Sequence, residues 1–179
     1  MSVNDQFPTN IPLKYVPVDK NHLKILQAGE PKTLDLKSEF KDSTVVISGY
    51  PGAFTKVCSA SHLPDYIKHI KQFKDKGVKN IIFLSVNDPF VNAAFGKALF
   101  KDAGVDDEDN YVIFATDPEG KLSKELSEDS VMDLSSAGMG LRLQRYAAIV
   151  ENGIIKYLGN ESEGNFTEIS SAENLLKKL

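Results

Sequence analysis

The sequence is poor in cysteine: Cys58 is the only one among its 179 residues. A single thiol cannot form a disulfide within the chain, which argues against the disulfide-stabilised scaffolds of many small secreted proteins. Long apolar runs are also missing, and none approaches the roughly 20 residues of a membrane-spanning helix. Basic residues are not in excess, since the formal net charge is −4. We therefore expect neither a nucleic-acid partner nor a membrane partner.

Targeting signals are weak as well. Residues 1–5 show neither the basic start nor the apolar stretch of a secretory signal peptide, so we expect a cytoplasmic protein. The final residues, Lys177-Lys178-Leu179, resemble the peroxisomal Ser-Lys-Leu ending only loosely. A basic helix C-terminus that complements the helix dipole explains these lysines better, and a peroxisomal location remains the weaker alternative.

The length and the hydrophobic content of 41% indicate a single domain over residues 1–179 with a sizeable core. Residues 1–40 contain four prolines and are expected to form a loop-rich N-terminal extension. Beyond it, strand patterns alternate with helix patterns, Asn152-Gly153 is typical of a type I′ hairpin, and Ser170 with Glu173 fits a capping box. This alternation predicts an α/β fold with a mixed central sheet flanked by helices. The expected strands are 44–50, 80–86, 111–115, 146–150 and 154–158, and the expected helices are 63–74, 91–101, 118–126 and a C-terminal one.

Cys58 stands between a strand pattern and a helix pattern, in the segment PGAFTKVC. Most lone cysteines are inert small hydrophobic residues, but the surroundings argue for more. They place Cys58 in the first turn of a helix, where free backbone N–H groups and the helix dipole favour a thiolate. Pro64 fits only a first helical turn, so we expect one short turn after Cys58 and a restart at Pro64. Thr55 brings a hydroxyl near the sulfur and Pro51 stiffens the loop, which together predict a reactive nucleophile.

These residues resemble a known family. Pro51, Thr55 and Cys58 match the Pro-x-x-x-Thr-x-x-Cys signature of peroxiredoxins, and the stretch PGAFTKVCSASHLP is similar to the type II, or five-type, subfamily. The resemblance covers roughly residues 40 to 179. It implies a thioredoxin-like fold and the reduction of hydroperoxides without a metal or a prosthetic group. Further blocks similar to the subfamily are SVNDPF at 85–90, GMGLRLQRYAAIV at 138–150, and the segment 166–179.

The resemblance also implies a role for each residue around the thiol. Cys58 attacks the peroxide, Thr55 orients the peroxide and hydrogen-bonds the sulfur, and Pro51 shields and rigidifies the loop. Arg145 is expected to stabilise the thiolate and to polarise the O–O bond, a task that suits a permanently charged guanidinium. Backbone N–H groups around the thiol are expected to complete the anion site. The residues expected to line the binding site are Gly52, Phe54, Val57 and His62.

Two neighbouring residues offer other chemistry. Arg142 precedes Arg145 by three positions, an odd spacing that puts it on the opposite face of an extended segment, where it is expected to support the loop. His62 follows Cys58 by four positions and would share a helix face with it. As a general base, His62 would give a Cys–His acyl-transfer enzyme; together with His69 it would give a zinc site. Neither arrangement shows the further residues that it needs, and no metal is expected.

A second, resolving cysteine is missing. Many type II peroxiredoxins carry one, and the corresponding positions are Phe83 for one subgroup and near Ile169 for another. Oxidised Cys58 must therefore meet an external thiol, which the resemblance suggests is glutathione with glutaredoxin, or thioredoxin. The resemblance further suggests a homodimer built from loops near the site. Apolar candidates for that contact are Phe54, Phe90 and Met139.

We predict from these features a thiol-dependent peroxidase that reduces hydrogen peroxide and alkyl hydroperoxides through Cys58. Two other classes stay open at this point. A redox-sensing or chaperone module on a thioredoxin-like scaffold would be oxidised without fast turnover. A Cys–His acyl-transfer enzyme would hydrolyse esters and ignore peroxide.

Overall fold

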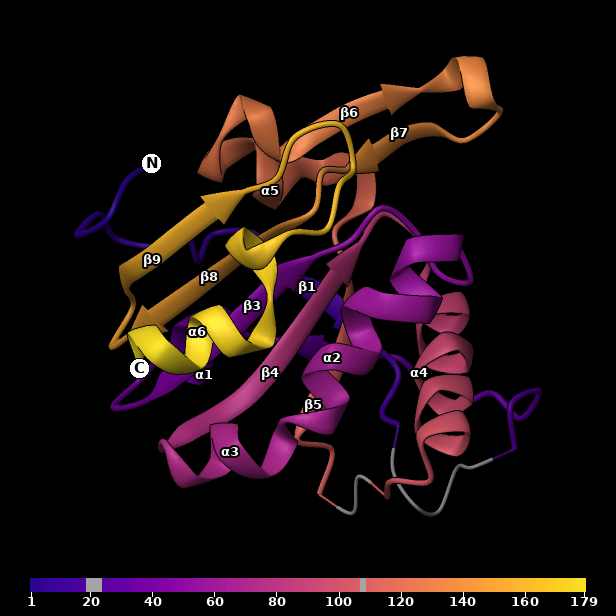
Figure 1. Cartoon of the computed structure of the whole chain (residues 1–179), viewed down its shortest axis with the longest axis horizontal. Coiled ribbons are helices and arrows are strands. Elements are labelled where there is room, and N and C mark those ends of the chain that lie inside the picture. Colours follow the sequence, from indigo (N-terminus) through magenta and orange to yellow (C-terminus); the bar gives the residue numbers. More distant parts are fainter. Residues whose placement is uncertain (19–23, 107–108) are drawn as a thin grey trace.

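The computed structural model describes residues 1–18, 24–106 and 109–179. Part of the predicted loop-rich extension, residues 19–23, therefore lies outside the described residues. Within them, seven strands form a mixed sheet at the centre of the molecule (Figure 1), in the order β2-β1-β5-β4-β3-β8-β9. Strands β3, β4 and β5 run parallel to one another, and the other neighbours are antiparallel. The strands are β1 (Leu13–Tyr15), β2 (Lys32–Leu34), β3 (Thr44–Gly49), β4 (Val78–Ser85), β5 (Val112–Thr116), β8 (Tyr146–Glu151) and β9 (Ile154–Asn160).

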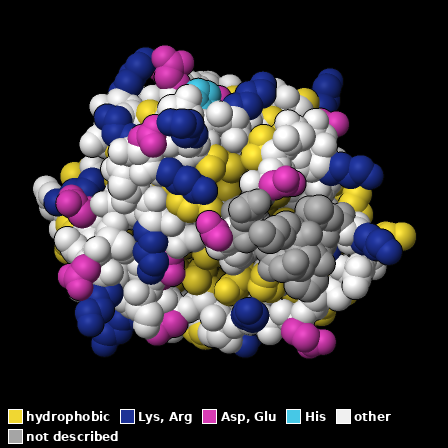
Figure 2. Space-filling model, turned by 90° about the horizontal axis from the view of Figure 1, so that it is seen from below, with side chains coloured by type: hydrophobic (Ala, Val, Ile, Leu, Met, Phe, Trp, Pro, Cys, Tyr) yellow, Lys and Arg dark blue, Asp and Glu magenta, His cyan; other side chains and the backbone are white. Residues whose placement is uncertain are grey.

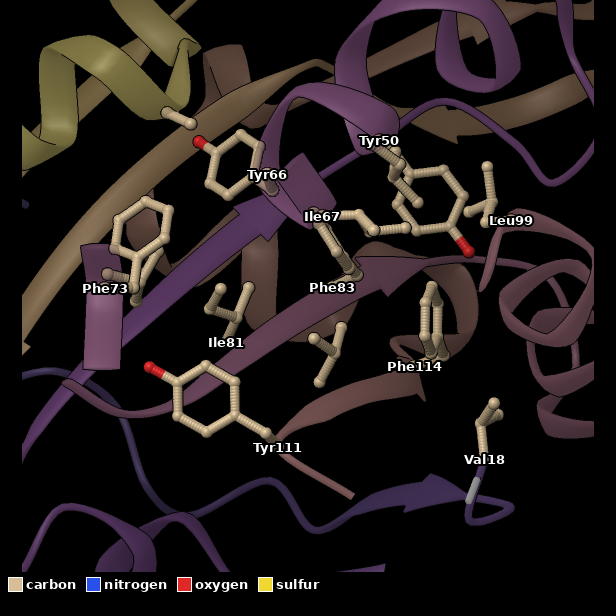
Figure 3. Packing of buried hydrophobic residues seen from close by; sticks show 14 of the residues in the cluster. Val18, Tyr50, Tyr66, Ile67, Phe73, Ile81, Phe83, Leu99, Tyr111 and Phe114 are labelled. Atoms are coloured by element: carbon tan, nitrogen blue, oxygen red, sulfur yellow. The ribbon is translucent and has the colours of Figure 1, made fainter. Parts of the chain in front are cut away.

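Helices cover both faces of this sheet because side chains alternate between the faces along each buried strand. In β3, Val46 faces one hydrophobic cluster while Val45 and Ile47 face the other. Figure 3 shows the first cluster, where the rings of Tyr66 and Phe73 stack with centroids 5.8 Å apart. The first face packs against α2 (Leu63–Lys68), α3 (Ile70–Asp75), α4 (Pro89–Ala103) and α6 (Ala172–Lys178), and the second against α1 (Leu36–Glu39) and α5 (Lys121–Leu126). The predicted mixed sheet flanked by helices is confirmed.

A separate hairpin lies beyond the main sheet, at the top of Figure 1. It consists of β6 (Val131–Leu134) and β7 (Gly140–Leu143). Because β7 ends at Leu143 and β8 begins at Tyr146, Arg145 lies in a short link between two strands that belong to different sheets. Short 3₁₀ turns complete the chain: Pro118–Gly120, Glu128–Ser130, Ser135–Ala137 and Glu168–Ser170.

The helix after Cys58 follows the prediction in part. Residues Cys58–His62 form a single wide π-helical turn, in which the N–H of Leu63 donates to the carbonyl of Cys58. Pro64 then lies in the first turn of α2, as predicted. Its ring has no N–H to donate and would clash with the carbonyl four residues back in a regular helix, and the wide turn avoids both problems. The predicted continuous helix 63–74 is wrong, because the chain breaks at His69 between α2 and α3.

Local turn and cap signals were mostly accurate. Asp88 caps α4 by accepting from the N–H groups of Phe90 and Val91, and Asn152 and Gly153 both have positive φ, as a type I′ turn requires. The capping box at Ser170 is wrong by one residue, since Ser171 caps α6. Ser170 instead donates to the buried carboxylate of Glu161.

The surface carries charges of both signs. Figure 2 shows Lys and Arg side chains interspersed with Asp and Glu side chains on the face that it presents. In the three described ranges, the structure contains no helix with both the length and the apolar character that a bilayer crossing demands.

Candidate active site

Cys58 lies beneath the surface at the start of a helix. The helical segment begins at Lys56, and the Cys58 side chain is only 1% exposed. The thiol packs within the hydrophobic cluster that covers the first face of the sheet. Its position in the first helical turn agrees with the prediction from the sequence. Backbone N–H groups of such a turn have no acceptors within the helix, so they favour an anion near the sulfur.

Arg145 is the cation that reaches this thiol. Its side chain is 1% exposed, and Nη1 lies 3.5 Å from the Cys58 sulfur. Nε donates to the carbonyl of Asn165 at 3.1 Å, and Nη2 donates to the carbonyl of Gly164 at 3.4 Å. Within the described part of the chain, no carboxylate forms an ion pair with this guanidinium. A buried guanidinium that lacks a carboxylate partner favours negative charge on an atom beside it, and the Cys58 sulfur is such an atom.

His62 is buried next to Arg145 and is neutral. Nδ1 lies 2.6 Å from Nη1 of Arg145 and Nε2 lies 2.9 Å from Oγ of Ser48. An arginine N–H can only donate, so Nδ1 accepts and the ring proton is on Nε2, which donates to Ser48. The Ser48 hydroxyl in turn donates to the carbonyl of Tyr146 at 3.0 Å. Neither nitrogen is available to take a proton from Cys58, which argues against a Cys–His hydrolase.

The loop before Cys58 is held by Arg142. Nη1 of Arg142 donates to the carbonyl of Pro51 at 3.2 Å, as expected for a residue that supports the loop. A Cβ atom added to Gly52 would lie 2.6 Å from that same Nη1, so a larger residue here would displace the end of the Arg142 side chain. The Thr55 hydroxyl donates to the carbonyl of Gly52 at 2.8 Å, and not to the sulfur as predicted. Phe54 adopts a positive φ of 60°, an uncommon conformation for a bulky residue that turns the chain sharply before the helix.

A pocket of about 220 Å³ opens beside these residues. Of the predicted residues, Pro51, Thr55, Val57 and Arg145 line it, together with apolar side chains of the β6–β7 hairpin. The other predicted residues do not line it. Cys58, Gly52 and His62 are buried, and Phe54 is 57% exposed and packs its ring 5.0 Å from that of Phe95. The hairpin side chains on the pocket are Met132, Leu134 and Met139.

Several supporting residues were missed from the sequence. The Gln144 side-chain oxygen accepts from the N–H groups of Arg145 and Gly164. The Glu161 carboxylate is 5% exposed as a residue and accepts from both the backbone and the hydroxyl of Thr167 and of Ser170. These bonds fix the loop whose carbonyls hold Arg145. No local sequence pattern marks either residue. The bond of Gln144 to Gly164 spans 20 positions and that of Glu161 to Ser170 spans 9, and both form only in the folded chain.

The zinc arrangement is not formed. His69 bonds to Asp65 through Nδ1, and both nitrogens of His62 are engaged as described above. Among the residues that the structure describes, no three His, Cys, Asp or Glu side chains are placed to hold a metal ion.

The buried His62 makes stability depend on pH. Burial, and to a smaller extent the charge of Arg145, holds the pKa of His62 well below its ordinary range. The unfolded chain binds a proton there near pH 6.5, while the folded chain does not, so the free energy of unfolding falls as the pH drops below that value. We expect the parent to lose stability more steeply than His62→Gln between about pH 6.5 and 5, by at most about 1.4 kcal/mol per pH unit. Urea unfolding across this range measures both slopes. The remaining histidines are present in both proteins, so identical slopes would contradict the prediction.

Comparison with known proteins identifies the family. A family model described as Redoxin matches residues 2–176. A Lipomyces kononenkoae protein named "Putative peroxisomal peroxiredoxin" is 44% identical over 162 residues, 90% of this chain and 92% of that protein. Peroxiredoxin Pen c 3 of Penicillium citrinum is 35% identical over 179 residues, 100% of this chain and 99% of that protein. The crystal structure of reduced Prx3 in complex with H₂O₂ from Vibrio vulnificus matches with a TM-score of 0.78 and 31% identity, covering 100% of this chain and 99% of that one.

Fold and comparisons together define a thiol enzyme built on the thioredoxin-like fold. The chain belongs to the Redoxin family and, within it, to the peroxiredoxins. It is a thiol-dependent peroxidase, with a hydroperoxide as substrate and a thiol as reductant. The predicted family, fold and activity are confirmed, and neither the redox-sensing or chaperone module nor the acyl-transfer enzyme is favoured.

Proposed function

We propose that Cys58 is the nucleophile of this peroxidase and that Arg145 is the cation that serves it. One observation carries the proposal. The sulfur of the chain's only cysteine lies 3.5 Å from Nη1 of a buried arginine. A guanidinium at this place stabilises the thiolate before the reaction and the developing oxygen charge during it.

The proposed reaction forms one bond and breaks one. The Cys58 thiolate attacks one peroxide oxygen, an S–O bond forms, and the O–O bond breaks. The second oxygen leaves as alkoxide or hydroxide and takes up a proton, so the products are Cys58 sulfenic acid and an alcohol or water. The sulfur is oxidised by two electrons and the peroxide is reduced by two.

Arg145 has a donor left for the substrate. A guanidinium carries five N–H groups; Nε uses one, Nη1 uses two and Nη2 uses one in the bonds described above. Counting only acceptors among the described residues, one Nη2 N–H remains, and Arg145 lines the pocket. We assign this N–H to a peroxide oxygen. A turn of the Thr55 side chain about χ1 would direct its hydroxyl from Gly52 to the other oxygen.

The pocket supports both small substrates. Hydrogen peroxide needs only the polar groups of Arg145 and Thr55. The apolar side chains of Met132, Leu134 and Met139 give the organic part of an alkyl hydroperoxide a surface to pack against. Pro51 shields the thiol on the loop side, where it is itself buried.

Recycling is proposed to require an external thiol, because the chain holds no second cysteine. Glutathione attacks the sulfenic acid, water leaves, and a mixed disulfide forms; a second thiol, from glutaredoxin or thioredoxin, then releases Cys58 by exchange. Intact mass spectrometry after one equivalent of peroxide should show the monomer plus one oxygen. After glutathione is added, the spectrum should show a glutathione adduct instead.

One result would contradict this scheme, and another would change only its reductant. Cys58–Cys58 dimers as the main product on non-reducing gels, with no adduct and no turnover by glutathione systems, would exclude the glutathione-linked mechanism. Turnover by thioredoxin alone would keep the peroxidase and change only the reductant.

Further proposals concern assembly, extent and location. Phe54, in the loop before Cys58, is 57% exposed, and Phe90, in the first turn of α4, is 48% exposed. This exposure supports a homodimer formed through these side chains, with the half-buried Met139 at its edge. We propose that residues 1–179 act as one domain.

A cytoplasmic location remains our proposal, and the name of the Lipomyces kononenkoae relative supports a peroxisomal one as the alternative. Lys177 and Lys178 lie in the last turn of α6.

A further inference from the structure

His62 contributes to the site in a way that neither general-base nor zinc chemistry describes. It connects the reactive arginine to the central sheet through three successive hydrogen bonds: Arg145 to His62, His62 to Ser48, and Ser48 to the carbonyl of Tyr146. Ser48 lies in β3 and Tyr146 in β8, which pair along their whole length. The accepting nitrogen of His62 is therefore held by two adjacent strands rather than by a loop.

The imidazole is also clamped from the side. Its ring lies against the rings of Tyr66, Phe83 and Phe166, with centroids 5.6, 6.3 and 5.1 Å away. The residue is completely buried. Packing on this scale leaves the ring one orientation, so Nδ1 presents its lone pair in a fixed direction.

The direction of this lone pair matters because it accepts from Nη1 of Arg145. Nη1 of Arg145 is the atom that contacts both His62 and the Cys58 sulfur. Its two N–H bonds lie in the guanidinium plane at a fixed angle, so holding one on Nδ1 aims the other at the sulfur. The other acceptors of the guanidinium belong to a loop: the carbonyl of Asn165 accepts from Nε and the carbonyl of Gly164 accepts from Nη2. Of these contacts, only the bond to His62 links Nη1 to the central sheet, through Ser48.

We propose that His62 is a positioning residue that aims Nη1 of Arg145 at the Cys58 thiolate. This inference rests on the proposed roles of Cys58 and Arg145. It requires an unprotonated acceptor at the place of Nδ1 and asks nothing of His62 as an acid or a base.

A matched pair of variants separates the two nitrogens. The side-chain oxygen of asparagine can occupy the place of Nδ1, whereas the terminal amide of glutamine reaches the place of Nε2. His62→Asn therefore keeps an acceptor for Arg145 and loses the bond to Ser48, and His62→Gln does the reverse. Both variants lose the same aromatic ring contacts, so loss of packing alone affects them alike.

The measurement is stopped-flow oxidation of the reduced thiol by hydrogen peroxide, with urea unfolding to compare stabilities. We expect His62→Gln to react about 10- to 100-fold more slowly than the parent, as for a misplaced catalytic group. His62→Asn should stay close to the parent rate, and alkylation of Cys58 at neutral pH should follow the same order.

Equal peroxide rates in the two variants, with both folded, would overturn the inference. If neither variant folds, nitrogen NMR of the His62 imidazole in the parent decides, because the inference requires a proton on Nε2 and a lone pair on Nδ1; a proton on Nδ1 would then overturn it. Failure of the proposed function looks different, since the parent itself would then keep its thiol in the presence of peroxide.

Discussion

Cys58→Ser is expected to abolish the turnover of hydroperoxides by thiol reductants. A serine hydroxyl ionises at a far higher pH than a thiol, so it supplies no comparable nucleophile at neutral pH, and it cannot form the sulfenic acid on which recycling depends. The assay is peroxide consumption with glutathione and glutaredoxin, or with thioredoxin, against a blank without enzyme. The variant should match the blank.

The composition of the chain simplifies the interpretation of this test, because only one thiol is present. Because Cys58 is the only cysteine, no second thiol can take over in the variant. The side chain is buried, so urea unfolding must accompany the assay; a single exchange of sulfur for oxygen is expected to cost about 2 kcal/mol or less. A folded Cys58→Ser protein with turnover comparable to the parent would show that Cys58 is not the nucleophile.

The features that could be predicted from the sequence are those governed by short-range rules. The cap at Asp88, the hairpin at Asn152-Gly153 and the restart at Pro64 each depend on a few adjacent residues whose backbone preferences are strong. The alternation of strands and helices follows from periodicity. The thiol loop was found for the same reason, since Pro51, Thr55 and Cys58 lie within one short segment.

The contacts that hold Arg145 could not be predicted in this way. His62 and Arg145 are 83 residues apart in the chain, and Ser48 is 98 residues from Tyr146. Only the pairing of β3 with β8 brings them together. The direction of the Thr55 hydroxyl, which bonds to Gly52, depends on a side-chain torsion that no sequence pattern fixes. His62 in particular is expected from the sequence to line the binding site, whereas in the structure it is buried and bonds to Arg145.

Arg145→Ala is expected to slow oxidation of Cys58 by peroxide at least about 100-fold, comparable to the loss of one donor that stabilises a transition state. The buried thiolate would lose its only neighbouring cation at hydrogen-bond distance among the described residues. Alkylation of Cys58 by iodoacetamide at neutral pH should slow as well, because the guanidinium 3.5 Å from the sulfur no longer stabilises negative charge there. Stopped-flow mixing with peroxide and a parallel alkylation series measure the two effects on the same protein.

Two control variants give the expectation its specificity. Arg145→Lys should restore only part of the rate, because an ammonium can replace the charge but cannot donate simultaneously to His62, the sulfur and the carbonyls of the neighbouring loop. Arg142→Ala removes a guanidinium of the same size that bonds to Pro51 and does not reach the sulfur, so it should have the smaller effect. Circular dichroism must show that Arg145→Ala remains folded, since the substitution leaves buried carbonyls without donors. An equally large loss in Arg142→Ala would contradict the assignment of Arg145 as the cation. Of the two arginines, Arg145 contacts the sulfur and Arg142 bonds to Pro51.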